Sequence, residues 1–201
     1  IGKDVKGSSA KYIPATNGLN LRLTIDYEIQ MICDAVIKKV VAEYAPKSAS
    51  VIVMSPKTGG IYAVSQCPSF NLNDVPRDDT GFLNKVSRCN LIVDSYEPGS
   101  TFKIITSAAN IEENLKGNPN AFSADYVFNS NRFRYVDGRK IKCWSTHAKG
   151  KHSNERLAEA LNNSCNPCFV DIALSLGKDV MYSYLDAFGF GKTTGVDYCG
   201  E

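Results

Sequence analysis

The sequence predicts a mixed α/β fold of the α+β type, in which an antiparallel sheet is flanked by amphipathic helices. The first observation is a β-branched run at residues 49–54, followed by a turn at 56–60 and an apolar run at 61–65, which predicts a hairpin. The second is a pair of long helical patterns, one capped by Asp26 and one covering residues 100–113.

Length and composition narrow the possible classes of protein. At 201 residues the chain can bury a hydrophobic core, either as one domain or as part of a larger one. A net charge of +2 argues against a dedicated nucleic-acid surface, so no nucleic-acid partner is expected. Seven cysteines is an odd number, which favours a reducing environment or metal ligation over a disulfide scaffold.

The N-terminal part of the chain is predicted to pass from an arm into a strand and a helix. Residues 1–18 are polar, with scattered Gly, Ser and Pro, and indicate a linker or an arm from a preceding domain. Residues 19–25 alternate apolar and polar side chains, as a strand does. The helix that begins after Asp26 is expected to bury Ile29, Ile32, Ala35, Val36, Val40 and Val41.

The later segments predict short helices and a second hairpin. Residues 67–95 are rich in Pro, Asn and Asp and are expected to form a long loop with short helical pieces. Asp137-Gly138 is expected to join two strands at residues 132–136 and 139–143. Three further helices are predicted, with stops at Gly177 and Gly189: residues 157–163, 166–176 and 178–188.

Two short motifs point to nucleophilic catalysis. Ser100 opens a helix, and Lys103 follows one turn later on the same face, as a serine nucleophile and a lysine base require. A helix-capping serine beside a solvated lysine is the alternative interpretation of Ser-x-x-Lys. Ser164-Cys165-Asn166, on a loop between two predicted helices, adds a hydroxyl for proton relay and a carboxamide that can hold a substrate amide. The combination is typical of penicillin-recognising serine acyltransferases.

These motifs belong to a longer ordered series. Six stretches match, in the same order, the sequence pattern of one known family. They are residues 20–26 with Gln30, 55–63, 68–73, 96–103, 161–166 and 188–191 with Thr194 and Gly195. Over nearly all of its length, the chain resembles the transpeptidase domain of class B penicillin-binding proteins. The resemblance implies the penicillin-binding protein and serine β-lactamase-like fold, with residues 1–18 as an arm and 19–201 as the N-terminal part of the domain.

The third motif of that family, a downstream Lys-(Thr/Ser)-Gly strand, has no counterpart in the sequence. Residues 57–59 spell Lys-Thr-Gly but lie in a predicted hairpin turn ahead of Ser100, and residues 192–195 directly follow the Phe-Gly-x-Gly segment. The fold is therefore expected to be incomplete at the C-terminus, with the molecule continuing past Glu201, because the helices without their sheet would expose a large apolar face.

The resemblance implies a serine-type peptidoglycan D,D-transpeptidase that needs no cofactor for its chemistry. Ser100 would attack a D-Ala-D-Ala stem peptide or a β-lactam, Lys103 would take its proton, Ser164 would shuttle a proton and Asn166 would hold the donor's amide. It also implies a missing N-terminal membrane anchor, an extracytoplasmic location and a glycosyltransferase partner. The alternatives are a β-lactam sensor or class D-type β-lactamase of the same fold, and a non-catalytic cell-wall scaffold.

A possible metal site is suggested by the residues alone. Cys143 and His147 stand four apart, and Cys165 and Cys168 form a Cys-x-x-Cys across the Ser-x-Asn loop. Two such pairs make the ligand set of a closed tetrahedral zinc site, in which His152 could replace one ligand. Core packing of Cys143 and chance spacing are the competing explanations. A structural zinc would couple this loop to the Ser164–Asn166 motif.

Overall fold

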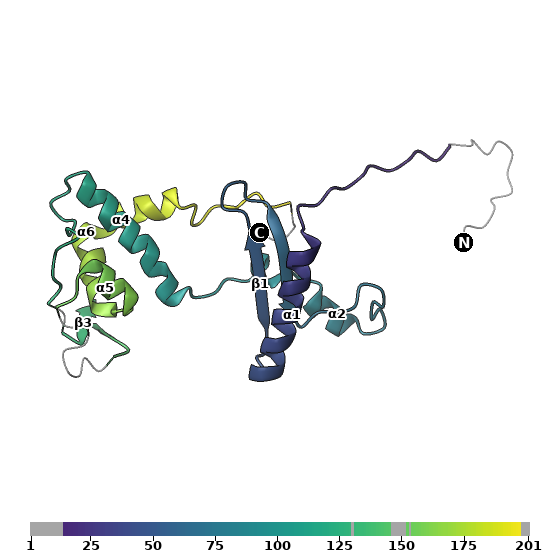
Figure 1. Cartoon of the computed structure of the whole chain (residues 1–201), viewed down its shortest axis with the longest axis horizontal. Coiled ribbons are helices and arrows are strands. Elements are labelled where there is room, and N and C mark those ends of the chain that lie inside the picture. The colour runs from purple at the N-terminus through teal and green to yellow at the C-terminus, as the bar shows by residue number, and fades with distance from the viewer. Residues whose placement is uncertain (1–13, 130, 146–151, 153, 198–201) are drawn as a thin grey trace. The chain divides into compact units, whose positions relative to one another are not determined.

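The computed structural model describes residues 14–129, 131–145, 152 and 154–197. The chain divides into two compact units, residues 1–93 and 94–201 (Figure 1), and each is described by itself. Among the described residues, no helix is long and apolar enough to cross a membrane. The division into an arm at residues 1–18 and one transpeptidase part stays a prediction.

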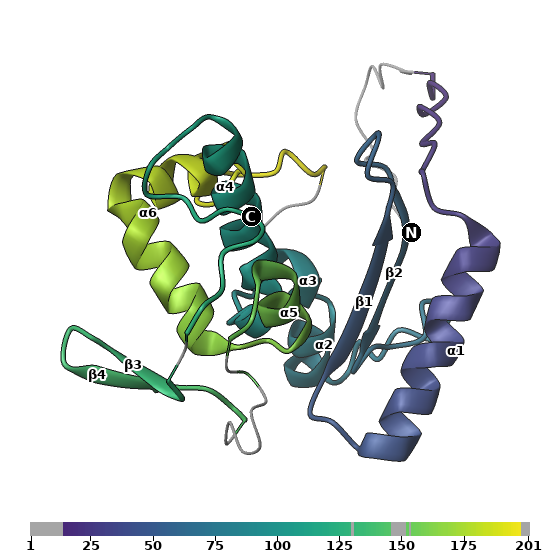
Figure 2. The same cartoon turned by 60° about the vertical axis from the view of Figure 1, so that its left-hand side comes forward.

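The first unit is a two-stranded antiparallel sheet with a long helix along it (Figure 2). The predicted hairpin is confirmed, because strand β1 pairs with strand β2 from Ala49 opposite Cys67 to Met54 opposite Ile61. The loop that follows contains two short helices, as expected. The elements are α1 (Tyr27–Tyr44), β1 (Ala49–Met54), β2 (Ile61–Cys67), α2 (Thr80–Val86) and α3 (Asn90–Val93).

Helix α1 begins where the sequence predicts, but it is rotated relative to the predicted buried stripe. The Asp26 carboxylate accepts a hydrogen bond from the Ile29 backbone N–H at 3.0 Å and so caps the helix. Cys33 is buried, whereas the side chains of Ile32 and Val36 are 63% and 49% exposed. The inward face includes a polar residue, Gln30, which a search for apolar periodicity leaves out.

Gln30 closes the outer edge of β2. Its side-chain amide donates to the Val64 carbonyl, and its side-chain oxygen accepts from the Val64 N–H, both at 2.9 Å. The carboxamide therefore takes the place of a neighbouring peptide group. Both backbone groups of Val64 are satisfied in this way without a third strand.

The strand predicted at residues 19–25 is wrong, because residues 14–26 have no regular secondary structure. Leu19 is fully exposed, and contact with the sheet is confined to the end of the segment. There the Thr24 hydroxyl donates to the Ile61 carbonyl at 2.6 Å, and the Asp26 N–H donates to the Tyr62 carbonyl at 2.8 Å. A strand forms only where a partner strand pairs with its backbone along its length. Among the described residues, this segment makes only the two hydrogen bonds from Thr24 and Asp26 to the sheet.

The second unit is mainly helical, with a small hairpin. Its elements are η1 (Gly99–Phe102), α4 (Lys103–Leu115), β3 (Phe133–Val136), β4 (Arg139–Lys142), α5 (Leu157–Asn162) and α6 (Asn166–Ala187). The predicted break in the last helix is confirmed, because Gly177 has a non-helical φ of +79° that divides α6. Ala109, Phe128, Ala160 and Ile172 are among the residues of the core where α4, α5 and α6 meet.

The predicted second hairpin is also confirmed. Asp137 and Gly138 have φ values of +47° and +75°, the pair of left-handed residues that a two-residue hairpin turn needs. The Arg134 guanidinium and the Asp171 carboxylate form two parallel contacts of 2.7 Å, which fasten strand β3 to α6. The hairpin is therefore held to the helix that follows the Ser-x-Asn motif.

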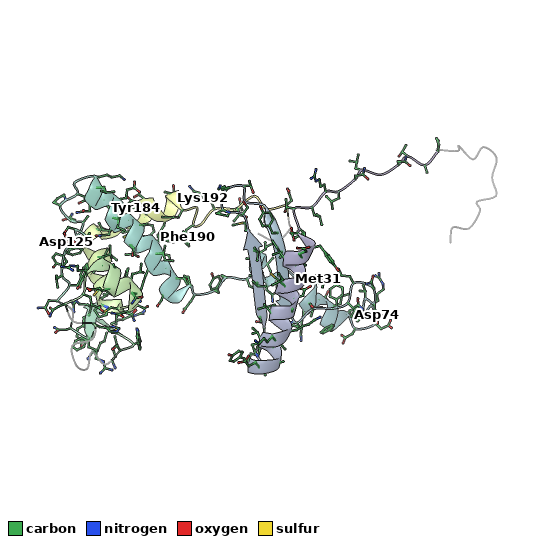
Figure 3. The ribbon with its side chains drawn as sticks, in the orientation of Figure 1. Met31, Asp74, Asp125, Tyr184, Phe190 and Lys192 are labelled. Atoms are coloured by element: carbon green, nitrogen blue, oxygen red, sulfur yellow. The ribbon has the colours of Figure 1, made fainter. Side chains whose placement is uncertain are left out.

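Two contacts between aromatic side chains and their neighbours tie the ends of α4 and α6 together; Tyr184 and Phe190 are labelled in Figure 3. The Tyr184 hydroxyl, near the end of α6, donates to the Glu113 carboxylate at 2.9 Å. After α6, the Phe190 ring meets the Phe102 ring edge to face, with centroids 5.7 Å apart. The turn that carries Ser100 is thus packed against the segment that follows α6.

We predict that Gln30→Ala lowers the free energy of unfolding by about 1–3 kcal/mol, because it leaves the N–H and C=O of Val64 without a protein partner. Urea unfolding measures the loss, and hydrogen exchange at the Val64 amide should accelerate. Lys39→Ala, an exposed change on the same helix, is the control. Equal stability of the two variants would show that water replaces the carboxamide at no cost.

Candidate active site

Ser100 lies on a tight turn at the start of a helix. Gly99 has a φ of +57°, a conformation that L side chains rarely adopt, and η1 then runs directly into α4. The Pro98-Gly99 pair therefore bends the chain immediately before Ser100. Ser100 is exposed, so its hydroxyl can be reached from the solvent.

Lys103 is buried at the centre of a group of oxygen atoms. Its side chain is one turn beyond Ser100, and the residue is only 9% exposed. The Nζ atom lies 2.6 Å from Asn166 Oδ1, 2.8 Å from Ser164 Oγ, 2.9 Å from the Ser164 carbonyl oxygen and 3.3 Å from Ser100 Oγ. The structure thus brings together all four of the residues that sequence analysis selected for acyl transfer.

The Ser-x-Asn motif occupies the link between α5 and α6. Ser164 has a φ of +54°, which is costly for a residue with a side chain and is common at functional positions. Its hydroxyl lies 2.8 Å from Ser100 Oγ. Asn166 opens α6, and its side-chain amide donates to the Lys142 carbonyl at 2.8 Å. Strand β4 therefore fixes which way the Asn166 carboxamide faces.

This geometry suits a neutral Lys103 amine as a proton acceptor. Two acceptors without protons, the Ser164 carbonyl and Asn166 Oδ1, can take the two N–H bonds of a neutral amine. The one lone pair is then left to accept a hydrogen bond from Ser100 or from Ser164. A proton can leave Ser100 directly, or it can pass through Ser164 in two steps of 2.8 Å.

Burial lowers the pKa of the Lys103 amine, since a buried ammonium loses its hydration. Three neighbouring cysteines, Cys143, Cys165 and Cys168, act in the opposite direction when they are thiolates, because negative charge favours the ammonium. Loss of hydration is the larger effect. The lysine is therefore easier to deprotonate than an exposed one.

Residues outside the two motifs support the Ser-x-Asn loop. The Trp144 indole N–H donates to the Asn163 carbonyl at 2.9 Å, and the Asn163 side chain donates to the buried Glu155 carboxylate at 2.5 Å. Sequence analysis missed Glu155 and the Lys142 carbonyl. A single acidic residue in a loop has no sequence pattern that marks it as a supporting residue. A backbone carbonyl is present in every residue, so no sequence motif can indicate it.

A buried group of thiols lies directly behind this loop. The ligand atoms of Cys143, His152 and Cys165 are all within 4.8 Å of one another, as are those of Glu155, Cys165 and Cys168. The Cys143 sulfur lies 3.4 Å from His152 Nδ1. Of the histidines considered as ligands, His152 is in the cluster, while His147 falls outside the described residues.

A family profile described as "Penicillin binding protein transpeptidase domain" matches residues 49–201. The chain belongs to the penicillin-binding protein transpeptidase family. The match begins with β1 and includes the turn of Ser100, the buried Lys103 and the Ser164–Asn166 loop. The expectation drawn from the sequence motifs, membership of this family, is confirmed.

Curated relatives agree with this assignment. The chain is 37% identical to the "Stage V sporulation protein D" of Bacillus subtilis over 204 residues, covering all of this chain and 29% of that protein. It is 26% identical to the "Peptidoglycan D,D-transpeptidase FtsI" of Escherichia coli, again over the whole chain and 32% of the relative. The chain therefore spans about a third of the length of these relatives.

A solved structure confirms the predicted fold. A crystal structure described as a peptidoglycan glycosyltransferase from Burkholderia ambifaria matches with a TM-score of 0.71 and 20% identity. The match covers 89% of this chain and 48% of that one. At this identity the likeness concerns the fold, a mixture of helices and antiparallel strands.

We predict that the rate of penicillin acylation rises with pH to a plateau, with a midpoint below the ordinary lysine pKa of about 10.4. The rise follows the neutral form of Lys103, whose pKa is lowered by burial. Lys103→Arg should be slower by orders of magnitude and should show no such rise, because arginine stays protonated. Lys178→Arg, an exposed change on α6, is the control. A folded Lys103→Arg protein with the normal profile would exclude Lys103 as the base.

Proposed function

We propose that this chain carries the acylation half of a peptidoglycan D,D-transpeptidase. The observation that supports it best is the buried Lys103 amine, which contacts Ser100, Ser164 and Asn166 at once. Serine, lysine and Ser-x-Asn are the set that penicillin-recognising serine acyltransferases use. Several of the curated relatives, FtsI of Escherichia coli among them, carry the activity in their names.

In the proposed reaction, Ser100 Oγ attacks the carbonyl carbon between the two D-Ala residues of a stem peptide, and its proton moves to Lys103. The resulting tetrahedral intermediate collapses to an acyl-enzyme. The terminal D-Ala leaves as the amine, taking back a proton through Ser164. The amine of a neighbouring stem then attacks the ester carbonyl, the bond to Ser100 Oγ breaks, and the proton that the amine gives up returns to Ser100 through Lys103. A β-lactam forms the same ester but keeps its leaving group tethered.

Asn166 has a constrained part in this scheme. Its oxygen faces Lys103 and one N–H is taken by the Lys142 carbonyl, so the substrate can use the second N–H and the second lone pair. The carboxamide therefore contributes to substrate binding while it holds the lysine. We propose that it contacts the donor's backbone amide from this fixed orientation.

Two other functions are compatible with the same catalytic set: a β-lactam sensor or class D-type β-lactamase, and a non-catalytic scaffold. The family match and the names of the relatives favour the transpeptidase. A β-lactamase would turn over nitrocefin many times, whereas a transpeptidase would be acylated once. A non-catalytic scaffold would gain nothing from a buried Lys103 amine beside the Ser100 hydroxyl.

We also propose that the protein acts at the extracytoplasmic face of the cell membrane, held there by an N-terminal anchor, with a glycosyltransferase as partner. The substrate of the proposed reaction is a polymer outside the cell, and the cross-linking of new stems must follow the extension of the glycan. These statements rest on the proposed function.

We predict a single covalent adduct when the protein is incubated with a labelled penicillin, and its loss in Ser100→Ala, because Ser100 is the exposed one of the two hydroxyls beside the Lys103 amine. Intact-mass spectrometry measures the adduct. Ser175→Ala, a hydroxyl on α6 that donates to the Asn120 carbonyl, is the control and should be acylated fully. An adduct that persists in Ser100→Ala would place the nucleophile elsewhere.

A second proposal concerns zinc. We propose that Cys143, His152, Cys165 and Cys168 hold a structural zinc ion, with His152 in the place that spacing first suggested for His147. A tetrahedral zinc with Zn–S bonds of about 2.3 Å separates its sulfur ligands by roughly 3.8 Å. The three atoms of Cys143, His152 and Cys165 are already within 4.8 Å of one another. The sulfur of Cys168 and a carboxylate oxygen of Glu155 are likewise within 4.8 Å of the Cys165 sulfur.

A bound cation would change the protonation of the cluster. Burial raises the pKa of the Cys143 thiol, so a thiolate there needs a neighbouring positive charge. Zinc would supply this charge. The cluster also includes the central residue of Ser164-Cys165-Asn166, so a metal there would hold the catalytic loop.

We predict about one zinc per chain by elemental analysis of protein purified without chelator or nickel resin. Cys143→Ser and Cys168→Ser should lose the metal, lower the melting temperature and slow acylation. Cys89→Ser, a half-buried cysteine outside the cluster, should keep all three properties. A metal-free preparation that melts at the same temperature would end the proposal.

A further inference from the structure

The β3–β4 hairpin has two unlike faces. Paired residues of an antiparallel ladder project to the same side, so Arg134 and Ile141 share one face, and Tyr135 and Lys140 share the other. The first face is half-buried and joins α6 through Asp171. In Figure 2 the tip of the hairpin extends away from α6, and the second face is exposed.

The exposed face combines aromatic rings with positive charges. It consists of Phe133, Tyr135, Lys140 and Lys142, all exposed, with Tyr135 at 61%. The two rings are 5.6 Å apart and edge to face, and the Lys140 ammonium lies 3.8 Å from the centre of the Phe133 ring. Within the described residues, neither lysine forms an ion pair. We call these four residues the aromatic–lysine face.

Positive charge is concentrated in this hairpin. Residues 132–142 contain five Arg and Lys residues and one acid, Asp137, although the net charge of the whole chain is only +2. Arg134 is neutralised by Asp171, which leaves the lysines of the exposed face available to an anion. Concentrated charge of one sign attracts ligands of the other sign.

The face is also joined to the candidate active site. Lys142 contributes its side chain to the aromatic–lysine face, and its backbone carbonyl accepts the hydrogen bond from Asn166. A polymer bound along the face would therefore lie next to the carboxamide that we propose contacts the donor peptide.

From these observations we propose that the aromatic–lysine face binds the glycan strand of uncross-linked peptidoglycan, whose sugar rings pack on Phe133 and Tyr135 while carboxylates of the strand pair with Lys140 and Lys142. The face of a sugar ring presents C–H groups, which suit the negative face of an aromatic ring. The proposal rests on the proposed function, because it takes the ligand to be the polymer that carries the stem peptides.

The size of the face favours a linear polymer over a protein partner. Two strands of four residues measure about 14 Å by 5 Å along the backbone, from a rise of about 3.4 Å per residue and a strand spacing of about 4.8 Å. A stable protein interface buries about 800 Å² on each partner, which is more than four side chains provide. A linear polymer could lie along this length.

The test measures the binding of soluble, uncross-linked glycan strands with intact stem peptides, in a Ser100→Ala background so that no strand is consumed. Tyr135→Ser combined with Lys140→Gln should weaken binding at least about tenfold, through loss of a stacking surface and a charge. The matched control is Tyr182→Ser with Lys178→Gln, an exposed tyrosine and lysine in the same kind of contact on α6, with 5.7 Å from ammonium to ring centre. It should bind as the parent does.

Several results would overturn the proposal. They are equal weakening by the two double variants, no binding by the parent protein, or equally strong binding of poly-glutamate, which would indicate an acidic protein partner. If the double variant does not fold, Lys140→Gln alone replaces it, because it changes only an exposed side chain. It should weaken strand binding by less than the double variant does. Penicillin acylation of the wild-type protein is measured separately. Acylation without strand binding refutes only the glycan face, and strand binding without acylation refutes only the proposed function.

Discussion

The arrangement of the second unit depends on keeping one amine out of water. Lys103 is a charged side chain by default, and its burial is tolerated because oxygen atoms from three residues surround its nitrogen. Those oxygens come from η1, from the loop between α5 and α6 and from the first residue of α6, so these segments have to meet at one point. The left-handed backbone of Ser164 and the hydrogen bond from Asn166 to strand β4 both serve that meeting.

The support around this point is arranged in layers. The β3–β4 hairpin accepts a hydrogen bond from Asn166, and Asp171 binds the hairpin through Arg134. Trp144 hydrogen-bonds to the Asn163 backbone, and Glu155 to the Asn163 side chain. Behind them lies the buried cluster of thiols. The short link from α5 to α6, which carries Ser164, is thereby fixed by side-chain and backbone contacts, although it has no regular structure of its own.

Most elements of the fold could be predicted from local sequence. The hairpins followed from turn chemistry at residues 56–60 and at Asp137-Gly138, and the break at Gly177 followed from glycine's freedom to adopt a positive φ. The buried faces could not be predicted from apolar periodicity, because polar residues occupy them. Gln30 pairs with Val64, and Asn110 pairs with both backbone groups of Phe122. The motifs named the residues that surround Lys103, whereas the orientation of Asn166 depends on a carbonyl that no motif specifies.

The two-residue turn at Asp137-Gly138 fixes the register of the β3–β4 hairpin, so odd and even changes in strand length have different effects. Side chains of a strand alternate between faces, so one inserted or deleted residue in β3 or β4 would exchange the faces beyond it. Arg134 would then point away from Asp171, and the aromatic rings would point toward α6. Two added residues would lengthen the hairpin and keep its faces. Among natural variants of this chain, length differences in the hairpin should therefore come in even numbers.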